Sequence, residues 1–171
     1  MIANGTKSLT SMISPSTIPD LVKFGAESDT YTIEIRPTTK CNYNCYYCVD
    51  LHNNKNPILE IDIQSVCDMI RTVKSVLHKK IRVYIYGGEP TLYPHLLELI
   101  NGLSSVCEDG DLIEIQSNFS RKVEYFKPLC KQIQNKHLVR FCGSYHNTHT
   151  NITKFLQVCL FLKKHWFLNM V

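Results

Sequence analysis

Apolar residues follow two alternating periodicities from residue 31 onward. Tyr31, Ile33 and Ile35 alternate with polar residues, which is typical of a half-buried β-strand. Similar short β-branched runs predict further strands at residues 81–86, 112–117 and 138–143, and the beginning of a fifth at 166–171. Between these runs apolar residues recur every three or four positions, which predicts helices at residues 61–80, 94–106, 122–135 and 150–165.

Strands that alternate with helices predict right-handed parallel crossovers and an α/β fold. A complete eight-unit barrel takes roughly 250 residues, so the segment from residue 31 to 171 has room for about four to five units. We therefore expect a partial parallel (β/α) barrel at residues 31–171. Residues 1–30 are rich in Ser and Thr without periodicity, and we expect them to form an irregular extension.

The composition of the 171 residues, 44% hydrophobic and 20% charged, suits one globular domain. No run approaches the roughly 20 apolar residues that span a bilayer, and the start of the chain lacks the pattern of a signal peptide. These features predict a soluble cytoplasmic protein with no membrane contact.

The net charge of +4 is unevenly distributed along the chain. Residues 121–171 hold nine Lys or Arg and a single acidic residue, Glu124. This basic C-terminal segment could meet an anionic partner, so nucleic acid is not excluded. The alternative is that these side chains are the solvated faces of helices.

Three of the eight cysteines follow the first predicted strand with the spacing C-x3-C-x2-C: Cys41, Cys45 and Cys48. Three such neighbours suit metal binding better than disulfide formation. A structural zinc site is closed by four protein ligands, whereas three thiolates leave one coordination position open. A four-iron cluster on these cysteines would likewise keep one iron free.

The chemistry of parallel α/β folds collects at the carboxyl ends of the strands. The cysteines follow the first predicted strand, and Gly87-Gly88-Glu89-Pro90 follows the second. Ser117-Asn118 and Ser144-Tyr145-His146 follow the third and fourth strands. We therefore expect these four segments to meet at one edge of the sheet.

The cysteine spacing, with an aromatic residue just before the last cysteine, is similar to the cluster motif of the radical S-adenosylmethionine (SAM) superfamily. Gly87-Gly88-Glu89-Pro90, after the second predicted strand, resembles the second signature of that superfamily. The two motifs stand in the same order as in the family, and the resemblance covers residues 32–171.

The resemblance implies a role for each of ten residues. Cys41, Cys45 and Cys48 would bind three irons of a 4Fe-4S cluster, and SAM would chelate the fourth iron. Tyr47 would lie near the adenine of SAM. Gly87, Gly88, Glu89 and Pro90 would meet its methionine amino group, and glycine suits this role because backbone without a side chain can approach a ligand closely. Asn118 and Ser144 would contact its carboxylate or ribose.

The activity implied by the resemblance is the reductive cleavage of SAM followed by hydrogen abstraction from a substrate, here unidentified. An external electron donor is required. Members of the family usually have about six strand-helix units, so this chain is expected to be truncated or to need a partner subunit that completes the barrel. The alternative is a catalytically incomplete cluster-binding or zinc-binding domain of the same fold that acts through a partner.

Several residues allow a second interpretation. His52 lies four residues after Cys48 and could complete a Cys3His zinc site. Glu89 could be a solvated turn carboxylate, and His146 could be a substrate contact, a proton donor or a loop residue without function. The remaining cysteines could bind an auxiliary cluster or be small buried hydrophobes; they are Cys67, Cys107, Cys130, Cys142 and Cys159.

Overall fold

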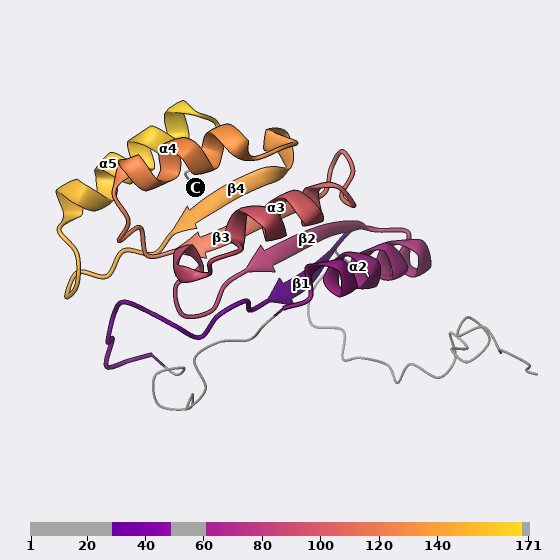
Figure 1. Ribbon diagram of the computed structural model, residues 1–171, viewed down its shortest axis with the longest axis horizontal. Coiled ribbons are helices and arrows are strands. Elements are labelled where there is room, and N and C mark those ends of the chain that lie inside the picture. Colours follow the sequence, from indigo (N-terminus) through magenta and orange to yellow (C-terminus); the bar gives the residue numbers. More distant parts are fainter. Residues whose placement is uncertain (1–28, 49–60, 169–171) are drawn as a thin grey trace, which may run out of the picture.

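The computed structural model describes residues 29–48 and 61–168, which form an open sheet of four parallel strands (Figure 1). The strands lie in chain order and are β1 (Thr30–Ile35), β2 (Lys80–Ile85), β3 (Leu112–Ser117) and β4 (Val139–Gly143). Each neighbouring pair is parallel. The predicted partial (β/α) barrel is therefore confirmed.

Helices connect the strands and cover one face of the sheet (Figure 1). The α-helices are α2 (Ile63–Leu77), α3 (Leu96–Ser104), α4 (Val123–Gln132) and α5 (Ile152–Lys164). Two short 3-10 helices, η3 (Pro90–Leu92) and η4 (Lys136–Leu138), lie before α3 and β4.

The two faces of the sheet differ in polarity because successive side chains of a strand point to opposite sides. On the helix-covered face Val83, Ile115 and Phe141 have no exposed surface, and they share one hydrophobic core with Leu99 and Phe126 of the helices. On the other face Arg82 donates to both carboxylate oxygens of Glu114, at 2.6 and 3.1 Å. The apolar face therefore anchors the helices, and the opposite face carries hydrogen-bonding groups.

The helices are shorter than predicted because local backbone geometry ends them. The helix predicted at 61–80 begins only after Asp62, whose carboxylate accepts a hydrogen bond from the Gln64 N–H at 3.1 Å. It ends at His78, which adopts a left-handed conformation with φ of 51°. The helix predicted at 122–135 likewise ends before Ile133, which is extended.

The helix predicted at 94–106 is split in two. Pro90, not Pro94, occupies the first turn of a helix, because η3 begins at Pro90 with Glu89 as its N-cap. The α-helix then begins at Leu96 with His95 as its N-cap residue. Pro94 therefore lies in the connection between the two helices.

The fifth strand predicted at residues 166–171 does not form at the described residues 166–168. Trp166 has a left-handed φ of 66° and lies in a turn after α5. The next residue returns to the sheet, since the Phe141 N–H of β4 donates to the Phe167 carbonyl at 2.6 Å. Residues 169–171 lie outside the described part of the chain.

Two predictions fall on segments outside the described residues. The irregular extension expected at 1–30 lies almost wholly in the first of these, and the possible zinc ligand His52 lies in the second. Neither prediction is tested. In the part of the chain that is described, no helix is long and apolar enough to cross a membrane.

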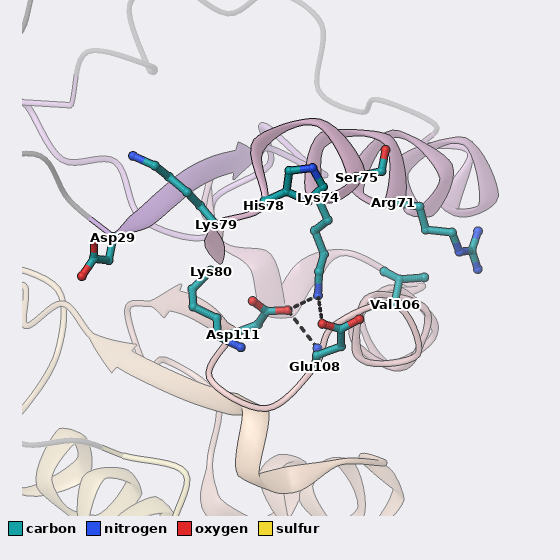
Figure 2. A pocket seen from close by; sticks show the side chains of 10 residues that line it. All are labelled: Asp29, Arg71, Lys74, Ser75, His78, Lys79, Lys80, Val106, Glu108 and Asp111. Carbon is teal, nitrogen blue, oxygen red and sulfur yellow. Dashed lines mark hydrogen bonds and ion pairs between the residues drawn. The ribbon is translucent and has the colours of Figure 1, made fainter. Parts of the chain in front are cut away.

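A pocket of about 720 Å³ lies at the amino ends of the strands (Figure 2). Its charged lining is largely engaged in internal contacts: Lys74 pairs with Asp111 at 2.5 Å and with Glu108 at 3.3 Å. Asp111 also accepts hydrogen bonds from the backbone N–H groups of Ile81 and Glu108, at 2.9 and 2.8 Å. This carboxylate therefore fastens α2 and β2 to the loop before β3.

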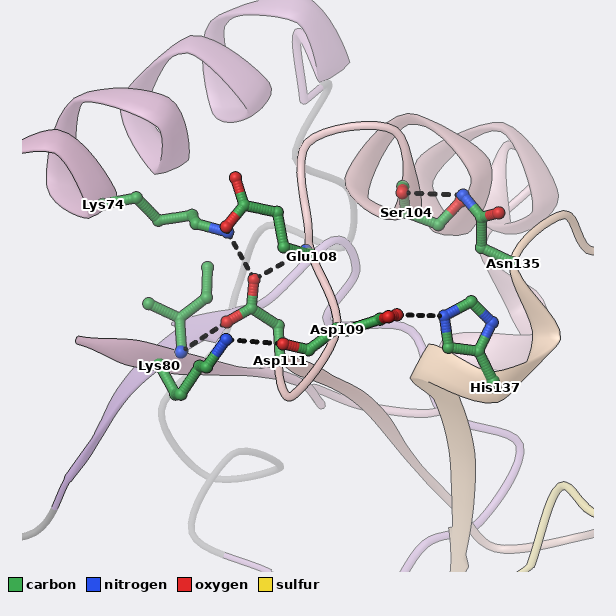
Figure 3. A network of polar contacts seen from close by, with 9 residues as sticks. Lys74, Lys80, Ser104, Glu108, Asp109, Asp111, Asn135 and His137 are labelled. Atoms are coloured by element: carbon green, nitrogen blue, oxygen red, sulfur yellow. Dashed lines mark hydrogen bonds and ion pairs between the residues drawn. The ribbon is translucent and has the colours of Figure 1, made fainter. Parts of the chain in front are cut away.

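The contacts continue along the same end of the sheet (Figure 3). Lys80 donates to the Asp109 carbonyl at 2.5 Å, and the Asp109 carboxylate contacts His137 of η4 at 3.0 Å. Asn135 donates to the Ser104 carbonyl at 3.0 Å. These contacts join elements to one another, which explains why the charged residues gather here.

Candidate functional site

A pocket of about 200 Å³ at the carboxyl ends of the strands brings the predicted site residues together. Nine of the ten predicted residues line it, and Pro90 does not. The nine are Cys41, Cys45, Cys48, Tyr47, Gly87, Gly88, Glu89, Asn118 and Ser144. The expectation that the loops after all four strands meet at one edge is therefore met. The roles of the individual residues stay predictions.

The cysteines lie on the loop after β1, residues 38–48, which we call the cluster loop. Cys45 is buried, Cys48 is partly buried and Cys41 is exposed. The loop folds back on itself, since the Cys48 N–H donates to the Cys45 carbonyl at 2.9 Å and the Tyr43 N–H points to the Cys41 sulfur at 3.4 Å. All three thiols thus border one pocket.

The loop after β2 is fastened directly to the cluster loop. Strand pairing continues past the ends of β1 and β2, because the Gly88 N–H donates to the Thr38 carbonyl at 3.0 Å and the Glu89 N–H to the Lys40 carbonyl at 2.7 Å. These two N–H groups are therefore engaged within the protein. The loop after β2 acts as a brace for the cysteine-bearing segment.

This brace explains why glycines occupy positions 87 and 88. A Cβ atom on Gly88 would lie 2.2 Å from the Lys40 carbonyl oxygen, and one on Gly87 would lie 2.3 Å from that of Thr38. Gly87 also has a φ of 144°, which side chains disfavour. The structure shows close approach of the chain's own cluster loop, and the predicted approach of a ligand to these glycines stays a prediction.

Glu89 is not a solvated turn carboxylate, because only 1% of its surface is exposed. One carboxylate oxygen accepts hydrogen bonds from the Thr91 hydroxyl at 2.7 Å and the Ser117 hydroxyl at 2.8 Å. The other accepts from the Asn118 N–H at 2.7 Å. Glu89 therefore ties the loop after β2 to the end of β3.

Asn118 extends this connection to the cluster loop. Its side-chain amide donates to the Asn42 side chain at 3.1 Å and lies 3.9 Å from the Cys41 sulfur. Its own side-chain oxygen accepts from the Ser120 N–H at 2.9 Å. A donor group of Asn118 thus faces the first cysteine of the motif.

Ser144 is held at the end of β4 by the neighbouring strand. Its N–H donates to the Ser117 carbonyl at 2.8 Å, and its hydroxyl accepts a hydrogen bond from the Gln116 side chain. Gln116 also accepts from the Tyr84 hydroxyl at 2.8 Å. Sequence reasoning missed Gln116 as a pocket residue, although its place one residue before the end of β3 on the polar face was a usable signal.

Tyr47 and His146 meet on one side of the pocket. The Tyr47 hydroxyl lies 2.7 Å from His146 Nδ1, and the two rings are parallel within 1°. Burial, with His149 nearby, lowers the pKa of His146 below its usual value. His146 is therefore part of the pocket and not a loop residue remote from it.

The other five cysteines lie apart from this pocket. Cys67, Cys130 and Cys159 are buried in the hydrophobic core, and burial raises the pKa of Cys130 and Cys107 to about 12. The Cys142 thiol donates to Glu114 at 2.9 Å. Within residues 29–48 and 61–168 no group of three or more His, Cys, Asp or Glu is placed to hold a single metal ion.

The cysteine motif also forms no single-ion site in this part of the chain. A four-iron cluster requires a different geometry, because each thiolate binds its own iron and the three sulfurs need only surround a common space. The three thiols fit this requirement, because they surround one pocket and lie on a loop that backbone hydrogen bonds hold in place.

The chain matches several known proteins over part of its length, although no known family profile matches it. A UPF0026 protein of Helicobacter pylori strain J99 is 38% identical over 78 residues, which are 42% of this chain and 25% of that protein. A probable GTP 3',8-cyclase of Archaeoglobus fulgidus is 32% identical over 87 residues, 48% of this chain and 28% of the cyclase. The chain thus covers about a quarter of the length of these relatives.

A solved structure shares the fold. The crystal structure of BtrN in complex with AdoMet and 2-DOIA matches 74% of this chain and 54% of the BtrN chain, with a TM-score of 0.50 and 17% sequence identity. This match shows the same arrangement of strands and helices. The two motifs and the sequence relatives support the assignment of the matched part of this chain to the radical SAM superfamily.

Proposed function

We propose that this protein is a radical SAM enzyme that holds a 4Fe-4S cluster on Cys41, Cys45 and Cys48 and binds SAM in the pocket beside them. The observation that carries the proposal is that these three thiols line one pocket with Gly87, Gly88 and Glu89. When bound, the cluster and SAM supply reductive cleavage of SAM and hydrogen abstraction from a substrate. An external electron donor of the cytoplasm would reduce the cluster.

The residues of the pocket would orient SAM by their polar groups. The loop from Gly87 to Pro90 uses the N–H groups of Gly88 and Glu89 internally, so its backbone carbonyls are the groups to accept from the SAM ammonium. The Asn118 side-chain amide and the Ser144 hydroxyl would contact the SAM carboxylate or ribose. Tyr47 would offer its ring to the adenine.

The test is a single anaerobic experiment on the full chain. Iron and acid-labile sulfide are measured after reconstitution, and 5'-deoxyadenosine is measured after incubation with SAM and dithionite. We expect both in the wild type and neither in Cys45→Ala. Cys159→Ala is the matched control, because Cys159 lies in the core on α5 and should keep both.

Two outcomes would count against the proposal. Zinc without sulfide would favour the alternative zinc site that includes His52. A cluster without 5'-deoxyadenosine would favour a second function, a cluster-binding domain that acts through a partner.

One observation favours that second function: α5 exposes apolar side chains at intervals of four residues. Ile152 is 46% exposed, Leu156 47% and Leu160 64%. Residues with this spacing share one helix face, and a further element or partner subunit that completes the barrel could cover it.

A further inference from the structure

His146 contacts two residues of the cluster loop through a single ring nitrogen. Its Nδ1 lies 3.4 Å from the Cys45 sulfur and 2.7 Å from the Tyr47 hydroxyl oxygen. His146 follows β4, whereas the cluster loop follows β1, at the opposite edge of the sheet. The two loops therefore close over the pocket from its two sides.

The orientation of the His146 ring is constrained on several sides. The ring is parallel to that of Tyr47 and meets the Tyr43 ring edge-on, with centroids 5.6 Å apart. Its backbone carbonyl accepts hydrogen bonds from the N–H groups of His149 and Thr150, each at 3.0 Å. The ring nitrogen that faces Cys45 is thus directed by packing and by the backbone turn.

The chemistry of the Cys45 sulfur determines whether His146 Nδ1 donates or accepts a hydrogen bond. A ring nitrogen of histidine donates where it carries a proton and accepts where it does not, so the role of Nδ1 depends on which ring nitrogen is protonated. An iron-bound thiolate can only accept, so the form of the ring that satisfies this contact carries its proton on Nδ1. The Tyr47 hydroxyl oxygen, 2.7 Å from the same nitrogen, then also accepts from this N–H. A hydrogen bond to a ligating sulfur disperses its negative charge, which favours the reduced form of a cluster and raises its potential.

We propose that His146 is a positioning residue that donates a hydrogen bond from Nδ1 to the Cys45 thiolate and raises the midpoint potential of the cluster. This inference rests on the proposed function, because it requires a cluster on Cys45. It assigns His146 to the cluster and not to the substrate.

The experiment is a redox titration of the anaerobically reconstituted full chain, followed by the electron paramagnetic resonance signal of the reduced cluster. His146→Phe keeps an aromatic ring but removes the nitrogen. His146→Asn returns an N–H donor near the position of Nδ1. His149→Phe is the matched control, since His149 stacks on Tyr43 with centroids 4.8 Å apart and does not line the pocket.

We expect a more negative midpoint potential in His146→Phe, a potential closer to the wild type in His146→Asn, and no shift in His149→Phe. Loss of iron from His146→Phe alone would also support the contact. Equal midpoint potentials in His146→Phe and the wild type, at equal iron content, would overturn the inference about His146 but not the proposed function. Loss of iron from all three variants would also overturn the inference about His146. A wild-type chain that takes up no iron and sulfide would overturn the proposed function as well.

Discussion

Glu89 and Asn118 are 29 residues apart and are joined by a hydrogen bond of 2.7 Å from the Asn118 N–H to the Glu89 carboxylate. The Asn118 side chain in turn donates to Asn42 of the cluster loop. The loops after three different strands are thus linked through one buried carboxylate. The shape of the pocket depends on this link, although Glu89 itself points into the protein.

Replacing Glu89 by Gln should destabilise the fold. One Glu89 carboxylate oxygen accepts three hydrogen bonds and the other oxygen accepts one. In Glu89→Gln the side-chain NH2 group must replace one of these oxygens. In either orientation of the amide, this NH2 group faces a donor of the protein and loses the hydrogen bond. We expect the free energy of unfolding in urea to fall by about 1–3 kcal/mol. Glu124→Gln, at an exposed site, should change it by less than about 0.5 kcal/mol. Equal stabilities of the two variants would contradict the assigned role of Glu89.

Gly88→Ala should displace the cluster loop, because the new Cβ would lie 2.2 Å from the Lys40 carbonyl oxygen. We expect less iron per chain after reconstitution and a lower urea midpoint. The control is Gly102→Ala in α3, whose Cβ would meet side-chain atoms of Ile63 and Cys67. That variant should keep its iron, whatever its stability. Full iron content in Gly88→Ala would show that the cluster loop does not need this close approach.

Asp111 should make stability depend on pH. Burial opposes its ionisation, but hydrogen bonds from Lys74 and from the Ile81 and Glu108 N–H groups hold its pKa below the usual value. Its contribution is therefore present above the unfolded pKa of about 3.9 and is lost as the pH falls through the lower folded pKa. We expect Asp111→Asn to lower the free energy of unfolding by about 3 kcal/mol at pH 7.

Urea titrations from pH 7 down to pH 3 check this dependence. The difference between wild type and Asp111→Asn should shrink in the lower part of that range. Asp68→Asn removes an exposed ion pair with Arg71 and should cost less than about 1 kcal/mol at any pH. A difference for Asp111→Asn that is constant with pH would mean that its charge does not stabilise the fold.

Phe167→Ala should be far more destabilising than Trp166→Ala, although the two residues are neighbours. Phe167 is 1% exposed and returns to the edge of β4, whereas Trp166 is 85% exposed. We expect the free energy of unfolding to fall by about 3 kcal/mol for Phe167→Ala and by less than about 0.5 kcal/mol for Trp166→Ala. Similar values for both would indicate that the chain after α5 does not pack on the sheet.

The sequence was enough to predict which residues gather at the pocket, because strand ends can be located from local periodicity. It was not enough to predict what Glu89 and Gly88 contact, since those partners belong to loops that meet only in the folded sheet. Gln116 was missed for the same reason: its partner, Ser144, follows the next strand. Helix ends were placed too far out because His78 turns the chain with a left-handed backbone, and such conformations leave little trace in hydrophobic periodicity.

The backbone hydrogen bonds from Gly88 and Glu89 to Thr38 and Lys40 also bear on the order of assembly. Donors and acceptors are separated by about 50 residues of chain, so we expect the cysteine segment to acquire its shape once β1 and β2 have paired. We expect metal-free protein to be folded already, with these two amides protected from hydrogen exchange. The iron-sulfur cluster would then bind to an already folded chain and would not be needed for the chain to fold.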